Sequence, residues 1–71
     1  MTKLPVISGK QLIKLLKREG FEVIRQKGSH VSLQKEGYKT VVPLHDELAK
    51  GTLRSILRQS GLSREKFMKM Q

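Results

Sequence analysis

Two histidines are the side chains of this 71-residue sequence that are best suited to catalysis by proton transfer. Histidine most readily both takes and gives a proton near neutral pH. His30 follows Gly28 and Ser29, a turn before an expected strand. Three cations are near it in sequence: Arg25, Lys27 and Lys35. A phosphate attracted to them would bring a ribose 2′-hydroxyl to the imidazole. An exposed histidine without a role explains the same pattern, and both interpretations stay open.

His45 is the second candidate for proton transfer. It follows Pro43 and Leu44 and precedes Asp46, whose carboxylate could orient the imidazole as in a catalytic triad. A loop residue that caps the next turn is the simpler interpretation. The sequence has no cysteine, no metal-ligand spacing of histidines or carboxylates, no glycine-rich phosphate loop and no serine-nucleophile motif. It therefore predicts neither a metal site nor a cofactor.

The charge of the chain favours a polyanionic ligand. Fifteen Lys and Arg against six Asp and Glu give a net charge of +9, which points to nucleic acid. Arg54 and Arg58 are four residues apart on an expected helix, where both could neutralise phosphates. Aromatic residues make up only 4% of the chain, which argues against modules that stack bases on aromatic rings.

The same composition excludes several other classes. Without cysteine there are no disulfides, as is usual in a reducing compartment. No apolar run is long enough to span a bilayer, and the first residues lack the apolar stretch of a signal peptide. We therefore expect a cytoplasmic protein with no membrane partner.

Capping residues and glycines predict the helices. Ser8 and Gln11 have the spacing of a capping box, which predicts a first helix over about 9–19. Thr52 is expected to cap a second helix, whose apolar stripe ends before Gly61. Each helix is apolar on one side only, so both should cover the same face of a sheet.

The segment between these helices predicts a sheet. Runs rich in β-branched and aromatic residues indicate strands over 21–26, 30–34 and 38–43, joined by tight turns. Ser63 is expected to cap a last short segment that buries Phe67. The fold class is therefore α+β, with the order α-β-β-β-α in a single domain over 1–71 whose core covers about 8–67. One face of the antiparallel sheet, with His30 and Ser32, stays available to a ligand.

Several short motifs follow one another in a characteristic order. They are Gly20-Phe21, Gly28-Ser29-His30, Pro43-Leu44-His45, the block over 51–57, and Gly61-Leu62-Ser63 followed by Phe67. This set resembles the HicA family of mRNA interferase toxins, also called YcfA-like proteins. The resemblance covers about residues 8–67. It implies a fold like that of double-stranded-RNA-binding domains, which agrees with the element order.

The resemblance also implies a function. Such a protein would be a translation-inhibiting endoribonuclease, neutralised by a HicB-type antitoxin; we expect a monomer alone and a hetero-oligomer with the antitoxin. The catalytic histidine of the family matches His30, and His45 matches a second histidine whose assistance stays open. Without a metal, the 2′-hydroxyl of the RNA would be the nucleophile. The residues expected to bind RNA phosphates are Arg25, Lys27, Ser29, Lys35, Arg54 and Arg58.

Two other classes stay open. A non-catalytic double-stranded-RNA-binding module would use His30 in the minor groove and Arg54 with Arg58 on phosphates. A protein-interaction domain would meet an acidic partner with its basic face. The variant His30→Ala separates the first class from an enzyme, because a binder loses part of its affinity and an enzyme nearly all its turnover.

Overall fold

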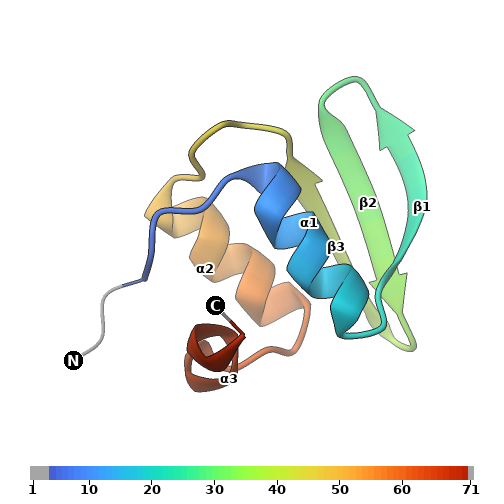
Figure 1. The fold of residues 1–71 in the computed structure, drawn as a ribbon. Coiled ribbons are helices and arrows are strands. Elements are labelled where there is room, and N and C mark those ends of the chain that lie inside the picture. Colours follow the sequence, from blue (N-terminus) through green and yellow to red (C-terminus); the bar gives the residue numbers. More distant parts are fainter. Residues whose placement is uncertain (1–3, 71) are drawn as a thin grey trace.

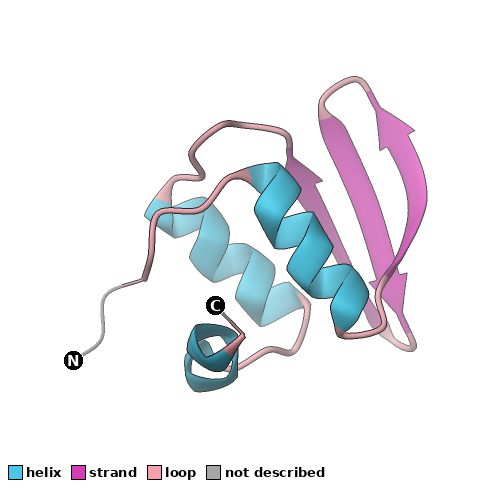
Figure 2. Cartoon of the chain, viewed as in Figure 1, coloured by secondary structure: helices cyan, strands magenta, loops and turns pink. Residues whose placement is uncertain are grey.

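Two helices cover one side of a three-stranded antiparallel sheet (Figure 1). The computed structural model describes residues 4–70. Its elements are α1 (Gly9–Arg18), β1 (Glu22–Lys27), β2 (His30–Lys35), β3 (Tyr38–Pro43), α2 (Lys50–Gln59) and α3 (Arg64–Lys69), as Figure 2 shows by colour. The predicted α+β class and element order are confirmed, and the predicted bounds of the first helix and the strands lie within one residue of the observed ones.

The side chains of β2 alternate between the two faces of the sheet. Val31 and Leu33 are 5% and 0% exposed, whereas His30 and Gln34 are exposed and Ser32 is half-buried. The buried pair belongs to a single core with side chains from β3 and all three helices: Leu12, Leu16, Val42, Leu53, Ile56, Leu57 and Phe67. Full burial of such a side chain contributes about 1.5–3 kcal/mol. The helices therefore cover the Val31 face, as predicted.

We call the opposite side of the sheet the open face. It carries His30, Ser32 and Gln34 of β2 together with the residues that pair with them on β1 and β3. All six residues of β1 are exposed, because this edge strand extends beyond the helices. One face of the sheet is therefore buried in the core and stabilises the fold, and the other face is accessible.

Two of the predicted helix caps are confirmed. The hydroxyl of Ser8 accepts a hydrogen bond from the backbone of Gln11, and the Gln11 side chain accepts one from the backbone of Ser8, at 3.1 and 3.0 Å. The hydroxyl of Ser63 accepts from the backbone N–H three residues on, at 3.0 Å. These local bonds satisfy helix-end amides that would otherwise lack partners.

The predicted cap of α2 is wrong. Thr52 lies inside the first turn, and the N-cap is Ala49, whose side chain makes no capping bond. The first helical bond runs from the Leu53 N–H to the Ala49 carbonyl, at 2.9 Å. Just before it, the Leu48 N–H donates to the Ile7 carbonyl at 2.9 Å, and the Leu48 side chain is buried. A tertiary contact, rather than a local cap, precedes the start of this helix.

An ion pair joins α1 to α3 at the side of the core. The Lys66 ammonium lies 2.8 Å from the carboxylate of Glu19. The hydrogen bond from Lys66 is the main cause that holds the pKa of the Glu19 carboxyl below its ordinary value. Desolvation opposes this shift, and the charges of Lys66 and Lys35 add to it. None of the helices within residues 4–70 has the length and hydropathy needed to cross a bilayer.

Candidate functional site

The turn between β1 and β2 presents His30. Gly28 has a φ of 60°, which suits the first central position of a two-residue hairpin turn. A Cβ at Gly28 would meet nothing within 4 Å, so conformation rather than space favours glycine here. His30 follows directly, paired with Lys27 on one side and Pro43 on the other, and its side chain is exposed on the open face.

Backbone hydrogen bonds hold the loop after β3 against this turn. The Leu44 N–H donates to the Ser29 carbonyl at 2.7 Å, and the Gly9 N–H donates to the His45 carbonyl at 2.9 Å. Figure 1 shows the β1–β2 turn, the start of α1 and this loop at one end of the sheet, at the top of the view. We call this end, residues 28–30 and 43–45, the turn end. It brings both predicted histidines into one region.

His45 is held through its backbone rather than its side chain. Its carbonyl accepts from the first turn of α1, and its imidazole is exposed. Within the described residues no hydrogen bond joins His45 to Asp46, so the orientation of the imidazole by this carboxylate is not observed. The close approach of α1 explains the glycine at its start, since a Cβ at Gly9 would collide with the Pro43 carbonyl oxygen.

The strand register arranges the open face in rows. The histidine row contains Lys27, His30 and Pro43, the serine row Arg25, Ser32 and Val41, and the glutamine row Glu22, Gln34 and Lys39. Neighbouring rows are two residues apart along β2, or about 7 Å. Lys27 therefore lies beside His30, and Arg25 lies one row away.

Cations dominate the part of the open face next to the turn end. Glu22 is the one carboxylate that the register places in the three rows, and it lies two rows from His30. Asp46 and Glu47 are in the loop, outside the sheet. A polyanion can thus approach His30 along the sheet without meeting a carboxylate in the first two rows. Within residues 4–70 no three His, Asp or Glu side chains are grouped as metal ligands would be.

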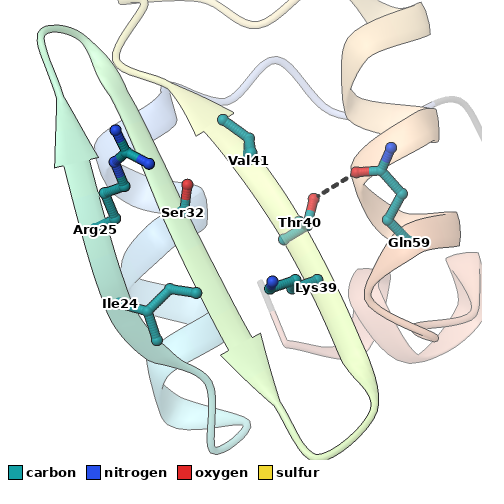
Figure 3. Close-up of a pocket in the computed structure, with 7 residues that line it drawn as sticks. All are labelled: Ile24, Arg25, Ser32, Lys39, Thr40, Val41 and Gln59. Atoms are coloured by element: carbon teal, nitrogen blue, oxygen red, sulfur yellow. Dashed lines mark hydrogen bonds between the residues drawn. The ribbon is translucent and has the colours of Figure 1, made fainter.

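A β-bulge shapes a hollow beside this row of cations. The pairing of β1 with β2 skips Ile24, which lies between the Val23–Leu33 and Arg25–Ser32 pairs. Ile24 and Arg25 consequently both line an open-face hollow of about 620 Å³. Its full lining is Ile24, Arg25, Ser32, Lys39, Thr40, Val41 and Gln59, drawn in Figure 3.

Most of the residues that line this hollow were not predicted from the sequence. Lys39 and Val41 alternate along β3 with the buried Thr40 and Val42, so Lys39 and Val41 point to the same face of the sheet. That alternation could have placed Lys39 and Val41 beside Ser32. Nothing in the sequence marks the bulge at Ile24, because the residue is an ordinary strand former.

Three predicted phosphate-binding residues lie away from His30. Lys35 ends β2, five residues and about 17 Å along the strand from His30. Its ammonium lies 6.0 Å from the centre of the Phe21 ring instead. Arg54 and Arg58 are exposed on α2, which packs on the covered side of the sheet. The structure thus unites Arg25, Lys27 and Ser29 with His30 but not these three.

A small α+β domain with an exposed histidine on a cationic sheet face is the class that these observations define. Residues 9–62 match the sequence model of a protein family, the HicA toxin of bacterial toxin–antitoxin systems. Because this match spans more than half of the chain, the protein belongs to the HicA toxin family, as its motifs indicated. No curated protein matches the sequence, and no solved structure matches either. The likeness to double-stranded-RNA-binding domains stays a prediction.

Proposed function

We propose that this member of the toxin family is an endoribonuclease that needs no metal ion and uses His30 as its general acid or base. The observation that carries the proposal is the position of His30. Its imidazole is exposed at the start of β2, Lys27 pairs beside it, and Arg25 lies one row away. A histidine next to cations has what RNA cleavage needs, a proton-transfer group where a phosphate is attracted.

The reaction uses a nucleophile that the substrate supplies. The 2′-oxygen of one ribose attacks the adjacent phosphorus, the bond from phosphorus to the 5′-oxygen breaks, and a 2′,3′-cyclic phosphate and a 5′-hydroxyl result. The 2′-hydroxyl loses a proton and the leaving 5′-oxygen gains one. His30 carries one of these transfers, for which general acid–base catalysis contributes about 10²–10⁴-fold. Water or His45, whose backbone is held at the same end of the sheet, carries the other.

The cations have separate roles in this proposal. Lys27 and Arg25 stabilise the charge that develops on the phosphate oxygens. Ser29, in the turn before His30, offers a hydroxyl to the same phosphate. Arg54 and Arg58, on the covered side of the sheet, contribute a general attraction for RNA that salt screens.

The proposed protein partner is a HicB-type antitoxin that covers the turn end. An inhibitor of this surface has to neutralise Lys27 and Arg25, so its contact residues should be acidic. Association of two such surfaces is fast and slows as salt is added. We propose a hetero-oligomer of toxin and antitoxin, with the toxin monomeric when alone.

The test is the cleavage of a mixed mRNA by purified protein in EDTA, with wild type beside His30→Ala and the product ends identified. We expect cyclic phosphate ends from the wild type and almost no products from the variant. Salt-sensitive RNA binding by both proteins without cleavage would support a binding module instead. Cleavage of RNA whose attacking 2′-hydroxyl is replaced by hydrogen would contradict the mechanism. Equal cleavage by both proteins would move the test to His45→Ala.

A further inference from the structure

We infer that the open-face hollow is a subsite for the base of a nucleotide next to the cleaved bond, and that the RNA is single-stranded there. The inference rests on the proposed endoribonuclease activity and adds to it the form of the substrate. It starts from the observation that the hollow and His30 share one face of β2.

The spacing along β2 suits one nucleotide. Ser32, at the centre of the serine row, is two residues from His30 and therefore about 7 Å away along the strand. This step is comparable to the length of one nucleotide in an extended strand. An RNA whose reacting phosphate lies at His30 thus has its neighbouring nucleotide over the serine row.

The lining of the hollow fits a nucleobase flanked by phosphates. Ile24 and Val41 are 47% and 46% exposed and give the hollow apolar walls against which the flat face of a base can pack. Arg25 and Lys39, from the two outer strands, supply charge for the phosphates on either side. A volume of about 620 Å³ exceeds what a base needs, so it excludes neither purines nor pyrimidines.

Polar groups at the hollow can bind the edge of the base. Ser32 offers a hydroxyl that donates and accepts. The hydroxyl of Thr40 donates to Oε1 of Gln59 at 2.8 Å, as the dashed line in Figure 3 marks. This bond fixes the Gln59 amide at the rim of the hollow and leaves its nitrogen as a donor. Any base preference at this position would come from Ser32 and Gln59.

These features favour a single strand over a duplex. In an A-form helix each base is stacked between neighbours and paired through its edge, so it cannot enter a hollow in a sheet. Bases that are splayed out of a single strand can be held by packing and by hydrogen bonds to their edges. Cleavage also requires the 2′-oxygen, phosphorus and 5′-oxygen to come roughly into line, which a flexible strand permits.

The experiment separates binding from cleavage by using the His30→Ala background. The dissociation constants of a labelled single-stranded RNA and of the same RNA in a duplex are measured by fluorescence anisotropy. A second change, Val41→Glu, replaces one of the two apolar walls of the hollow with a carboxylate. The matched control is Val6→Glu, because Val6 is 72% exposed, precedes α1 and does not line the hollow. Circular dichroism checks that both variants fold.

We expect Val41→Glu to weaken single-strand binding about tenfold or more, and Val6→Glu to change it less than about threefold, since both add the same charge to the protein. Lys39→Ala should reduce the slope of log affinity against log salt by about 0.7, the value for one phosphate contact to a single strand. Lys17→Ala, exposed in the last turn of α1, should leave the slope unchanged. The duplex should bind more weakly than the single strand.

Other outcomes overturn the inference alone, or the proposed function together with the inference. Unchanged RNA binding and cleavage in Val41→Glu, in otherwise wild-type protein, would remove the subsite while the nuclease stands. Equal binding and cleavage of the duplex would do the same. If Val41→Glu weakened only binding of the antitoxin, the hollow would belong to a protein contact. If the wild-type protein neither bound nor cleaved RNA, the proposed function would fall and the inference with it.

Discussion

The two ends of β2 contrast in how they use their side chains. At the turn end, backbone groups make the tertiary bonds: Leu44 to Ser29, and Gly9 to His45. The imidazoles of both histidines are exposed. At the opposite end, which we call the far end (residues 35–38), side chains make the contacts. Lys35 lies near the Phe21 ring, and the Tyr38 ring packs where a Cβ at Gly61 would be.

This difference separates two cations that look alike in the sequence. Lys27 lies just before the strand that carries His30 and Lys35 ends it, and both were predicted to bind phosphate. Lys27 pairs with His30, whereas Lys35 lies about 17 Å from His30 along β2. There the Lys35 side chain is half-buried beside the Phe21 ring. At the turn end the backbone contacts leave both imidazoles exposed, whereas at the far end the Lys35 side chain is already in contact with the protein.

Among the variants considered, His30→Ala should reduce kcat for RNA cleavage the most, and Lys35→Ala is its control. Loss of the proposed proton-transfer group should lower kcat for RNA cleavage about 10²–10⁴-fold. Replacement of Lys35 should leave kcat nearly unchanged, because Lys35 lies about 17 Å along β2 from His30. Single-turnover cleavage at saturating protein measures both. A comparable loss in Lys35→Ala would mean that the far end takes part in catalysis as the turn end does.

The next effect tests whether the backbone contacts hold the turn end in place. Gly9→Ala puts a methyl group against the Pro43 carbonyl oxygen, so α1 must shift away from the strand. We expect a loss of about 1–3 kcal/mol in the free energy of unfolding, as for overpacking in a core. Cleavage per folded molecule should fall as well, because His45 and Pro43 are moved. Urea titration and activity at low temperature measure the two losses.

Gly51→Ala is the matched control for that change. Gly51 lies in the first turn of α2, and a Cβ there would meet nothing within 4 Å. Alanine should therefore raise stability by about 0.5–1 kcal/mol, the usual difference from glycine in a helix. If both variants lost stability equally, the close contact at Gly9 would not be the cause.

Local signals predicted much of the fold. The reciprocal bonds of Ser8 and Gln11 depend on residues three positions apart, so the sequence alone reveals them. Val31 and Leu33 alternate with polar neighbours, which identified the buried face of β2. The same alternation put His30 on the open face. Where a short-range pattern determines the structure, the prediction succeeded.

Features that depend on distant parts of the chain were not predictable. The bond from Leu48 to Ile7 joins segments about 40 residues apart, and it accompanies a helix start at Ala49 where Thr52 looked like the better cap. The bulge at Ile24 depends on how two strands pair. The distance between Lys35 and His30 was hidden because neighbours in sequence are far apart in an extended strand.

A smaller effect should appear at the far end without reaching the site. Glu36 has a φ of 52°, a left-handed conformation that a residue with a long side chain rarely adopts. Asparagine tolerates this conformation better, so Glu36→Asn should raise the free energy of unfolding by about 0.5–1 kcal/mol. The melting temperature should rise by roughly 2–8 °C, and kcat should stay unchanged. Glu36→Val, which is β-branched, should lower the melting temperature.

The smallest effect depends on pH. The pKa of the Glu19 carboxyl lies below its ordinary value of 4.5 because Lys66 donates a hydrogen bond to it. A lowered pKa means that the stabilisation is present above about pH 4.5 and disappears as the pH falls through the pKa of the folded protein. Glu19→Gln should therefore melt slightly below the wild type at pH 7, and the difference should vanish in acid.

Glu65→Gln is the control for this pH effect. Its partner Lys69 is 3.6 Å away, and both side chains are about four-fifths exposed, whereas the Glu19 side chain is only 20% exposed. The exposed pair should contribute less, because water competes for both charges. Melting curves of the three proteins from pH 3 to 7 make the comparison. A difference between wild type and Glu19→Gln that persisted at pH 3 would mean that packing of the side chain, rather than its ion pair, joins α1 to α3.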